Sequence, residues 1–317
     1  MVNALSRFIT LLGKHASYTL PIGVFLGLFF PFLSSFFKDY LVITLLVPLT
    51  LSLVRIETAE LFRAMKNWRL VTLLTAWVLI ACPIVMWALL SPLNIQSPIL
   101  VAAIIAAAAP PVTACAAVAL FLRINAAIAV VITVTTMLLV PVSLPLILKY
   151  LAPLQANINL WALSLNLAGF ILLSFTLAFV IKKAVPKKKL HASRYLMDGV
   201  SVVFISIFTI GIMNGISDLF FQNQWFVIET LIVSTCVVFF LYVISTILFW
   251  GTGPRTAMAI GLCSGNFNLG LMYIALEKHT SIDVLIFFGI GQIPMYCLPS
   301  LLAPIIQKLI THYEPKP

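Results

Sequence analysis

Residues 101–121 read VAAIIAAAAPPVTACAAVALF, an apolar stretch that two consecutive prolines interrupt near its centre. Proline removes a backbone N–H donor and clashes with the preceding helical turn, and the residue before a proline is disfavoured in helical geometry. We expect a helix that breaks at Pro110-Pro111 and resumes near Val112, with Thr113 in the first turn of the second half. The free N–H groups there and the positive end of the helix dipole favour an anion or a polarised oxygen. A kinked helix that only packs against its neighbours is the alternative.

A second polar interruption lies in residues 255–276, where the segment 264–271 reads SGNFNLGL. Asparagine side chains at membrane depth are costly unless they pair or line a wet cavity. Either Asn266 or Asn268 could instead be hydrogen-bonded to a neighbouring helix as structural glue. Two interrupted helices at corresponding positions of two halves indicate a binding site near the bilayer midplane. The candidate substrate-binding residues are therefore Pro110, Pro111, Thr113, Ser264, Gly265, Asn266 and Asn268.

The composition of the whole chain places both interruptions in a membrane. Of the 317 residues, 62% are hydrophobic and 9% are charged, whereas soluble globular chains carry about 45–50% apolar and about 25% charged residues. The apolar runs are long enough for membrane-spanning helices and too uniformly apolar for barrel strands. We predict an all-α membrane protein with ten transmembrane helices, at residues 17–37, 40–56, 69–90, 97–122, 125–150, 159–181, 195–217, 225–250, 255–276 and 281–311.

The basic residues indicate how these spans are oriented. Sixteen of the 19 Lys and Arg residues lie in the tails and in the connections after spans two, four, six and eight, and only Lys38, Lys149 and Lys278 lie on the other side. Because cytoplasmic loops carry an excess of basic residues, we predict a multi-pass protein of the cell inner (plasma) membrane with both termini in the cytoplasm. The net charge of +10 is then explained by the basic residues that fix the orientation of the spans in the membrane. The lipid bilayer is the expected partner, with no nucleic acid and no obligate protein partner.

An internal repeat is indicated by the spacing of the helix-breaking residues. Ser264-Gly265-Asn266 follows Pro110-Pro111 by about 154 positions, and prolines recur at nearly the same offset in the spans that come next. Five spans in each half is an odd number, so the second half must have the opposite orientation. We predict a 5+5 inverted repeat made of residues 1–152 and 153–317, with a seam near 152–158.

Two motifs resemble a known family. APPVTACAAVALFLRINAAIAVVITVTTMLLVP, residues 109–141, is similar to the fourth and fifth helices of the bile acid:sodium symporter family. SGNFNLGL resembles a segment of that family's ninth helix, and the chain is similar to a bacterial homologue that diverges in the sodium-site motifs. The resemblance covers essentially the whole chain. It implies a panel domain of spans 1, 2, 6 and 7 and a core domain of spans 3–5 and 8–10, with discontinuous helices 4 and 9 crossing in the core.

The same resemblance implies where a cation would bind, and this chain departs from the family there. The family's Ser-Asn pair falls on Cys115 and Ala116, its helix-nine Glu on Cys263 and its Gln on Phe267, while a Thr is retained as Thr133. Hard cations require oxygen ligands. Thr133, Cys115 and Cys263 are therefore expected to form only a weak, degenerate cation site.

The other eight carboxylates of the chain lie at the ends of predicted spans, in loops or in the tail, and only Glu229 falls further inside a span. It lies about one turn from the outer end, where it can reach interfacial water. A charge at the centre of a membrane helix costs about 2.5–3.5 kcal/mol on insertion scales. Glu229 is therefore either an interfacial side chain or a proton-coupling acid.

These observations favour a secondary active transporter of a small organic anion that works by alternating access. In the resemblance, Thr113 and Asn268 occupy substrate-facing positions. The alternatives are an uncoupled uniporter or exchanger of organic solutes and a non-transporting membrane sensor. No enzyme is expected, because all four His residues lie at span ends or in loops and the chain has no HExxH motif. No cofactor is expected and sodium is not favoured. The five Cys residues have no metal-binding spacing, so no metal site is expected either.

Overall fold

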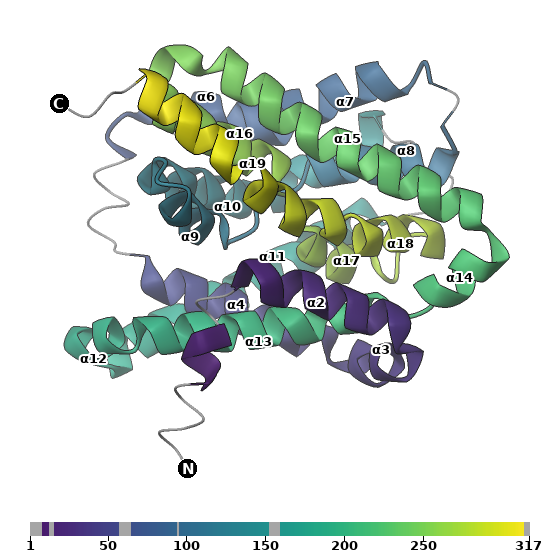
Figure 1. Ribbon diagram of the computed structural model, residues 1–317, viewed down its shortest axis with the longest axis horizontal. Helices are drawn as coiled ribbons and strands as arrows, with labels where there is room; N and C mark the ends of the chain where they lie inside the picture. The colour runs from purple at the N-terminus through teal and green to yellow at the C-terminus, as the bar shows by residue number, and fades with distance from the viewer. Residues whose placement is uncertain (1–7, 13–15, 57–64, 94, 152–158, 314–317) are drawn as a thin grey trace. The chain divides into compact units, whose positions relative to one another are not determined.

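The structure is a computed structural model that describes residues 8–12, 16–56, 65–93, 95–151 and 159–313. These residues form helices, and a single isolated β-bridge is the only extended pairing among them (Figure 1). The described residues fall into two compact units. Unit 1 takes its residues from the ranges 1–56 and 169–227, and unit 2 takes its residues from 57–168 and 228–317.

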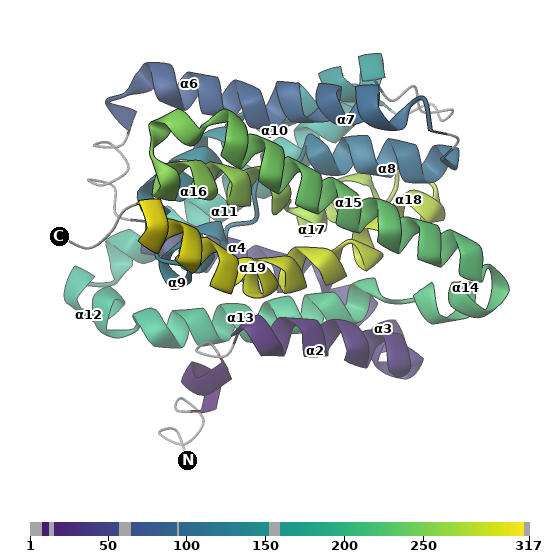
Figure 2. The same cartoon turned by 45° about the horizontal axis from the view of Figure 1, so that its top comes forward.

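Unit 1 is built around one long helix. Its helices are α2 (Ala16–Phe29), α3 (Pro31–Phe37), α4 (Leu41–Arg55), most of α11 (Leu160–Ala184), α12 (Lys187–Ala192), α13 (Arg194–Ile212) and α14 (Ile216–Gln222). Helix α13 packs against α2, α3 and α4, and α2 and α3 lie beside it in both Figure 1 and Figure 2. Gly23 and Gly27 lie one turn apart on α2, where a Cβ would collide with the Thr209 hydroxyl and with the backbone of Ile210, respectively. Small residues at this spacing allow two membrane helices to approach closely.

Polar side chains join the ends of three helices in unit 1. Arg55, the last residue of α4, forms an ion pair with Asp198 on α13. Near the end of α11, the Nζ of Lys182 donates a hydrogen bond of 2.7 Å to the carbonyl oxygen of Ile56. These contacts connect segments that are distant in the chain.

The boundary between the first two predicted spans differs from the structure. Helix α2 ends at Phe29, and Phe30 has φ −121° and ψ 77°. From Pro31 to Arg55 the chain is helical throughout, with only a 3-10 turn at Lys38–Tyr40 where the prediction had placed the connection. Pro31 accounts for the difference, because a proline disfavours helical geometry in the residue before it.

The described residues contain seven helices that are long and apolar enough to cross a membrane. The prediction of an all-α membrane protein is confirmed at this level. The count of ten spans remains a prediction: α2 is short, and the spans predicted at 97–122 and 255–276 are each divided into two short helices. The seam predicted near 152–158 lies outside the described residues.

Unit 2 surrounds α10 (Ala126–Leu151). Its other helices are α6 (Trp68–Ala76), α7 (Cys82–Leu90), α8 (Ser97–Ala107), α9 (Cys115–Phe121), most of α15 (Gln224–Leu248), α16 (Pro254–Gly265), α17 (Leu269–Leu276), α18 (Ile282–Ile290) and α19 (Gln292–Tyr313). Helix α10 contacts α6, α7, α8, α9 and α16. A π-helical turn, Trp77–Ala81, joins α6 to α7, which follow one another along one line in Figure 2. Helices α8 and α16 are buried on nearly all sides, as expected of helices that are apolar all round.

Candidate functional site

The two interrupted helices of unit 2 meet at their interruptions. Between α8 and α9 the chain is non-helical around Pro110-Pro111, and between α16 and α17 it is non-helical at residues 266–268. The backbone N–H of Val112 donates to the carbonyl oxygen of Asn266, and the N–H of Asn268 donates to the carbonyl oxygen of Pro110, both at 2.8 Å. These bonds form the antiparallel bridge between Pro111 and Phe267. Irregular backbone at membrane depth requires such internal partners.

The second half of the first interrupted helix begins later than predicted. Helix α9 starts at Cys115 rather than near Val112, so half-buried Thr113 lies before the helix and not in its first turn. The N–H of Val112, which the prediction had left free for an anion, is bonded to Asn266 instead. The backbone of the second interrupted segment therefore occupies the hydrogen-bonding position at Val112 that the sequence had suggested for a ligand.

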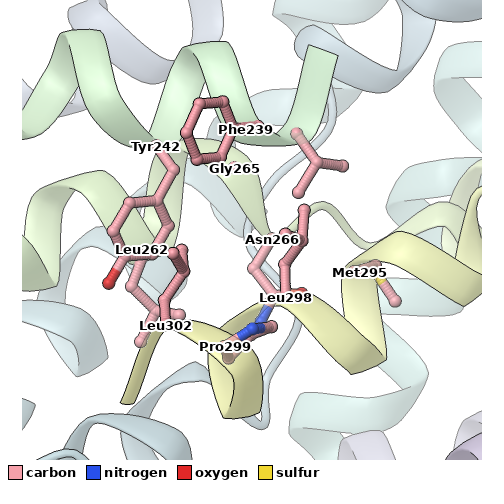
Figure 3. Close-up of a pocket in the computed structure, with 10 residues that line it drawn as sticks. Phe239, Tyr242, Leu262, Gly265, Asn266, Met295, Leu298, Pro299 and Leu302 are labelled. Carbon is pink, nitrogen blue, oxygen red and sulfur yellow. The ribbon is translucent and has the colours of Figure 1, made fainter. Parts of the chain in front are cut away.

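Asn266 is the predicted residue that keeps an unsatisfied polar atom. Its side chain is only 5% exposed, and its Oδ1 has no hydrogen-bond partner within the described part of the chain. Asn266 and Tyr242 both line a small cavity between α15, α16 and α19 (Figure 3). The cavity measures about 10 Å³, close to the space that one water molecule needs. The accessible wall of this cavity is apolar, so the unpartnered Oδ1 of Asn266, and not the cavity, is the feature here that would suit a polar ligand.

Asn268 has a structural role that the sequence analysis did not assign. Its Oδ1 accepts a hydrogen bond of 3.0 Å from the backbone N–H of Leu271 and so caps the N-terminus of α17. Asparagine is among the preferred residues at this position. The side-chain oxygen is committed to the helix, which leaves the amide N–H groups for any ligand.

Asn268→Ala is expected to lower the free energy of unfolding by about 1–2 kcal/mol, the usual effect of losing a helix cap. Asn268→Ser is the matched control, because serine can cap the helix with a smaller side chain. Both values are obtained by denaturant titration of the purified protein in detergent. If the alanine variant were as stable as the serine variant, the cap would not contribute.

The two predicted residues at the end of α16 serve its packing. The Ser264 hydroxyl donates to the carbonyl oxygen of Ile260 at 2.9 Å. Gly265 faces α15 so closely that a Cβ would lie 2.6 Å from the carbonyl oxygen of Val238. Together the interruptions bring Pro110, Pro111, Asn266 and Asn268 into one place, and Ser264 and Gly265 directly precede Asn266 at the end of α16.

The three predicted cation residues also meet at this crossing. The Cys115 thiol lies 3.8 Å from the carbonyl oxygen of Asn266, and the Cys263 thiol lies 4.0 Å from that of Ala129. The Thr133 hydroxyl donates to the same Ala129 carbonyl at 2.8 Å. The described residues contain no group of three or more His, Cys, Asp or Glu that could hold a metal. The arrangement presents sulfur and carbonyl oxygen, a poor ligand set for a hard cation.

The sequence analysis left the role of Glu229 open, and the structure gives it a partner. Its carboxylate accepts a hydrogen bond of 2.8 Å from the side-chain amide of Gln96 and one of 3.3 Å from the Gln96 backbone N–H. Gln96 is the N-cap residue of α8. A carboxylate at the positive end of a helix dipole is stabilised, so Glu229 connects the start of α8 to α15.

Glu229→Ala is expected to cost about 1–2 kcal/mol of stability, because hydrogen bonds to a charged group contribute about 1.5–3 kcal/mol and this carboxylate is only half-buried. Glu229→Gln keeps one acceptor oxygen and is expected to lose less. Unfolding titrations of the three proteins give the values. A stable Glu229→Gln variant whose solute uptake no longer depends on pH would instead make Glu229 a coupling acid.

Two further polar residues of unit 2 were not identified from the sequence. Gln292 is fully buried, and neither its amide nitrogen nor its oxygen has a partner in the part of the chain that the structure describes. Tyr242 is 7% exposed, and its hydroxyl is likewise unpartnered there. An amide inside the apolar span 281–311 was a visible signal for Gln292. Tyr242 gave none, since a tyrosine in a membrane span most often packs by its ring.

The fold and the crossing of the two interrupted helices define the class of this protein as an all-α membrane protein. No protein-family model matches the chain, and no curated protein matches it.

Proposed function

We propose that this protein is a secondary transporter that moves a small organic anion across the plasma membrane by alternating access. The pairing of two interrupted helices inside unit 2, through the backbones of residues 110–112 and 266–268, carries this proposal. Discontinuous helices are the usual source of midplane substrate sites in secondary transporters. The buried Asn266, with its unpartnered Oδ1, and the half-buried Thr113 are the first residues that we assign to the substrate.

The proposal includes the topology of ten spans in an inverted repeat of residues 1–152 and 153–317, with both termini cytoplasmic. It is supported by the recurrence of the helix-breaking residues and by the partition of the Lys and Arg residues. We also propose that spans 1, 2, 6 and 7 form a panel domain and the remaining spans a core domain. The division of the chain into units 1 and 2 supports this assignment, because unit 1 takes its helices from the same four spans.

The choice of an organic anion rests on the family resemblance and on the amide groups at the crossing. An uncoupled uniporter or exchanger is the second candidate. It is favoured by Cys115 and Cys263, which place thiols where the resembling family has oxygen ligands for sodium. A membrane sensor would bind a solute at the same crossing without moving it.

A ligand screen followed by uptake tests the proposal. Purified protein is heated with each of a panel of small monocarboxylates and dicarboxylates, since a ligand that binds the native state raises the melting temperature. The radiolabelled binder is then offered to proteoliposomes, with protein-free liposomes as the control. Uptake above the control, reduced at least tenfold by Asn266→Ala, is the expected result. Binding without uptake would contradict transport and favour the sensor.

Replacing sodium by potassium or choline at constant ionic strength is expected to change uptake of that binder less than about threefold, which is under about 0.7 kcal/mol. The physical reason is the ligand set. Thr133 and backbone carbonyls offer neutral oxygens only, and Cys115 and Cys263 offer sulfur. Initial rates in the three salts give the ratio. A tenfold or steeper dependence on sodium would restore a sodium symporter.

A further inference from the structure

The connection between α11 and α13 carries a dense group of basic side chains. Both helices are long and apolar enough to cross a membrane, and the connection is short, so the end of α11 and the start of α13 lie at the same face of the bilayer. Helix α12 lies at this end of α13 in both Figure 1 and Figure 2. Five exposed cations of unit 1 are gathered here, and we call them the basic corner: Lys183, Lys187, Lys188, Lys189 and Arg194.

The backbone of this connection is folded. The N–H groups of Lys189 and Leu190 donate to the carbonyl oxygen of Pro186 at 2.9 and 3.1 Å, and the N–H of Ser193 donates to the carbonyl oxygen of Lys189 at 2.9 Å. The Leu190 side chain packs against a small apolar cluster whose buried members are Leu53, Val54 and Ala178. The basic side chains are therefore displayed together at a fixed place on unit 1.

The charge of the basic corner is not balanced by nearby acidic residues. Residues 160–197 contain no Asp or Glu, and the first carboxylate after them, that of Asp198, is paired with Arg55. None of the five cations forms an ion pair in the part of the chain that the structure describes. Like charges that lie close together repel one another. A surface of opposite charge outside the protein would therefore stabilise this group.

We propose that the basic corner binds the headgroups of anionic phospholipids in the adjacent leaflet. Clusters of about four to eight Lys and Arg residues directly beyond a membrane helix are typical of binding to anionic lipid. A lipid is favoured over a soluble polyanion by the residues that follow Arg194. Tyr195 and Leu196 are 64% and 36% exposed, and tyrosine is enriched at the level of the headgroups. The ammonium groups would bind phosphate oxygens while these two side chains contact the apolar part of the lipid.

This lipid site differs from the orientation signal that the same residues give. The orientation of a membrane protein depends on the number of basic residues in each loop, whereas a binding site requires them to be displayed together in the folded protein. The inference is also independent of the transport proposal, because it requires neither a solute nor its movement. The test is therefore made on purified protein in detergent, without an uptake assay.

The full chain is titrated with phosphatidylglycerol or with phosphatidylcholine, and bound lipid is counted by native mass spectrometry. We expect phosphatidylglycerol to bind at least about tenfold more tightly, because each Lys near an anionic surface contributes about fivefold, or about 1 kcal/mol. Changing the three lysines of α12 to glutamine, in Lys187→Gln/Lys188→Gln/Lys189→Gln, is expected to weaken that binding by at least about tenfold. The corresponding triple arginine variant keeps the charges and is expected to bind like the parent.

The matched control is Lys66→Gln/Arg69→Gln/Lys308→Gln, which removes three exposed cations of unit 2 and so lowers the net charge by the same amount. Its binding of phosphatidylglycerol is expected to change less than about threefold, or about 0.7 kcal/mol. The proposal is overturned if both glutamine variants lose binding equally, because net charge alone would then explain it. It is equally overturned if the α12 variant binds phosphatidylglycerol as tightly as the parent.

A competition experiment identifies the source of the phosphate group. Glycerol phosphate, which is the headgroup chemistry without acyl chains, is added at millimolar concentration to the complex with phosphatidylglycerol, and a short single-stranded RNA is added in a parallel sample. The lipid is expected to stay bound in both samples. Displacement by either competitor would overturn the proposal and assign the basic corner to a soluble phosphate compound or to nucleic acid.

Discussion

Gly27→Ala is expected to lower the free energy of unfolding by about 1–3 kcal/mol, the usual range for overpacking a tight contact. A Cβ on Gly27 would lie 2.6 Å from the carbonyl oxygen of Ile210 and 2.8 Å from its Cα. Both atoms belong to the backbone of α13, so neither can rotate away. Helices α2 and α13 would have to separate, which loses contacts along the whole interface.

The matched control is Gly169→Ala on α11, where a Cβ would meet nothing within 4 Å. Alanine has a higher helix propensity than glycine by about 0.8–1.0 kcal/mol, so this variant is expected to be as stable as the parent or more so. Denaturant titration in detergent compares the three proteins. Equal stability of the Gly27→Ala and Gly169→Ala variants would show that the approach of α2 to α13 is not tight.

Asp198→Ala is expected to lower the free energy of unfolding by about 2 kcal/mol. Asp198 is paired with Arg55 on α4, and the two side chains are 25% and 18% exposed. Breaking a fully buried ion pair costs about 3–5 kcal/mol, and a fully exposed pair contributes about 0–1 kcal/mol. The expected value lies between these limits. Arg194 also interacts with both members of the pair, so removing Asp198 leaves two cations without their shared anion.

A double-mutant cycle isolates the contribution of this pair. If the ion pair is the interaction lost, Arg55→Ala/Asp198→Ala destabilises the protein by less than the sum of the two single changes, with a coupling free energy of at least about 1 kcal/mol. Lys182→Ala, which removes a separate hydrogen bond to Ile56, is a third variant. Its change in the free energy of unfolding should add to that of Asp198→Ala. Strict additivity of Arg55→Ala and Asp198→Ala would contradict the role assigned to the pair.

The sequence alone determined the class of protein and the places where its helices are interrupted. Composition decides membrane insertion, because 62% hydrophobic residues leave too little polar surface for a soluble fold. The interruption at Pro110-Pro111 follows from a local property, since proline acts on its own helical turn. The same local rule at Pro31 would have placed the first helix boundary at Phe30. The helix cap formed by Asn268 is also a local feature that could have been predicted from the sequence.

The family resemblance implied that the two interrupted helices cross, but the tertiary structure alone decided which of their atoms meet. The bonds from Val112 to Asn266 and from Asn268 to Pro110 join residues that are far apart in the chain, as does the contact of Glu229 with Gln96. No periodicity or spacing encodes such pairs, because they depend on how buried helices pack in three dimensions. For the same reason the sequence left the N–H of Val112 free for an anion, whereas in the folded chain it donates to the carbonyl oxygen of Asn266.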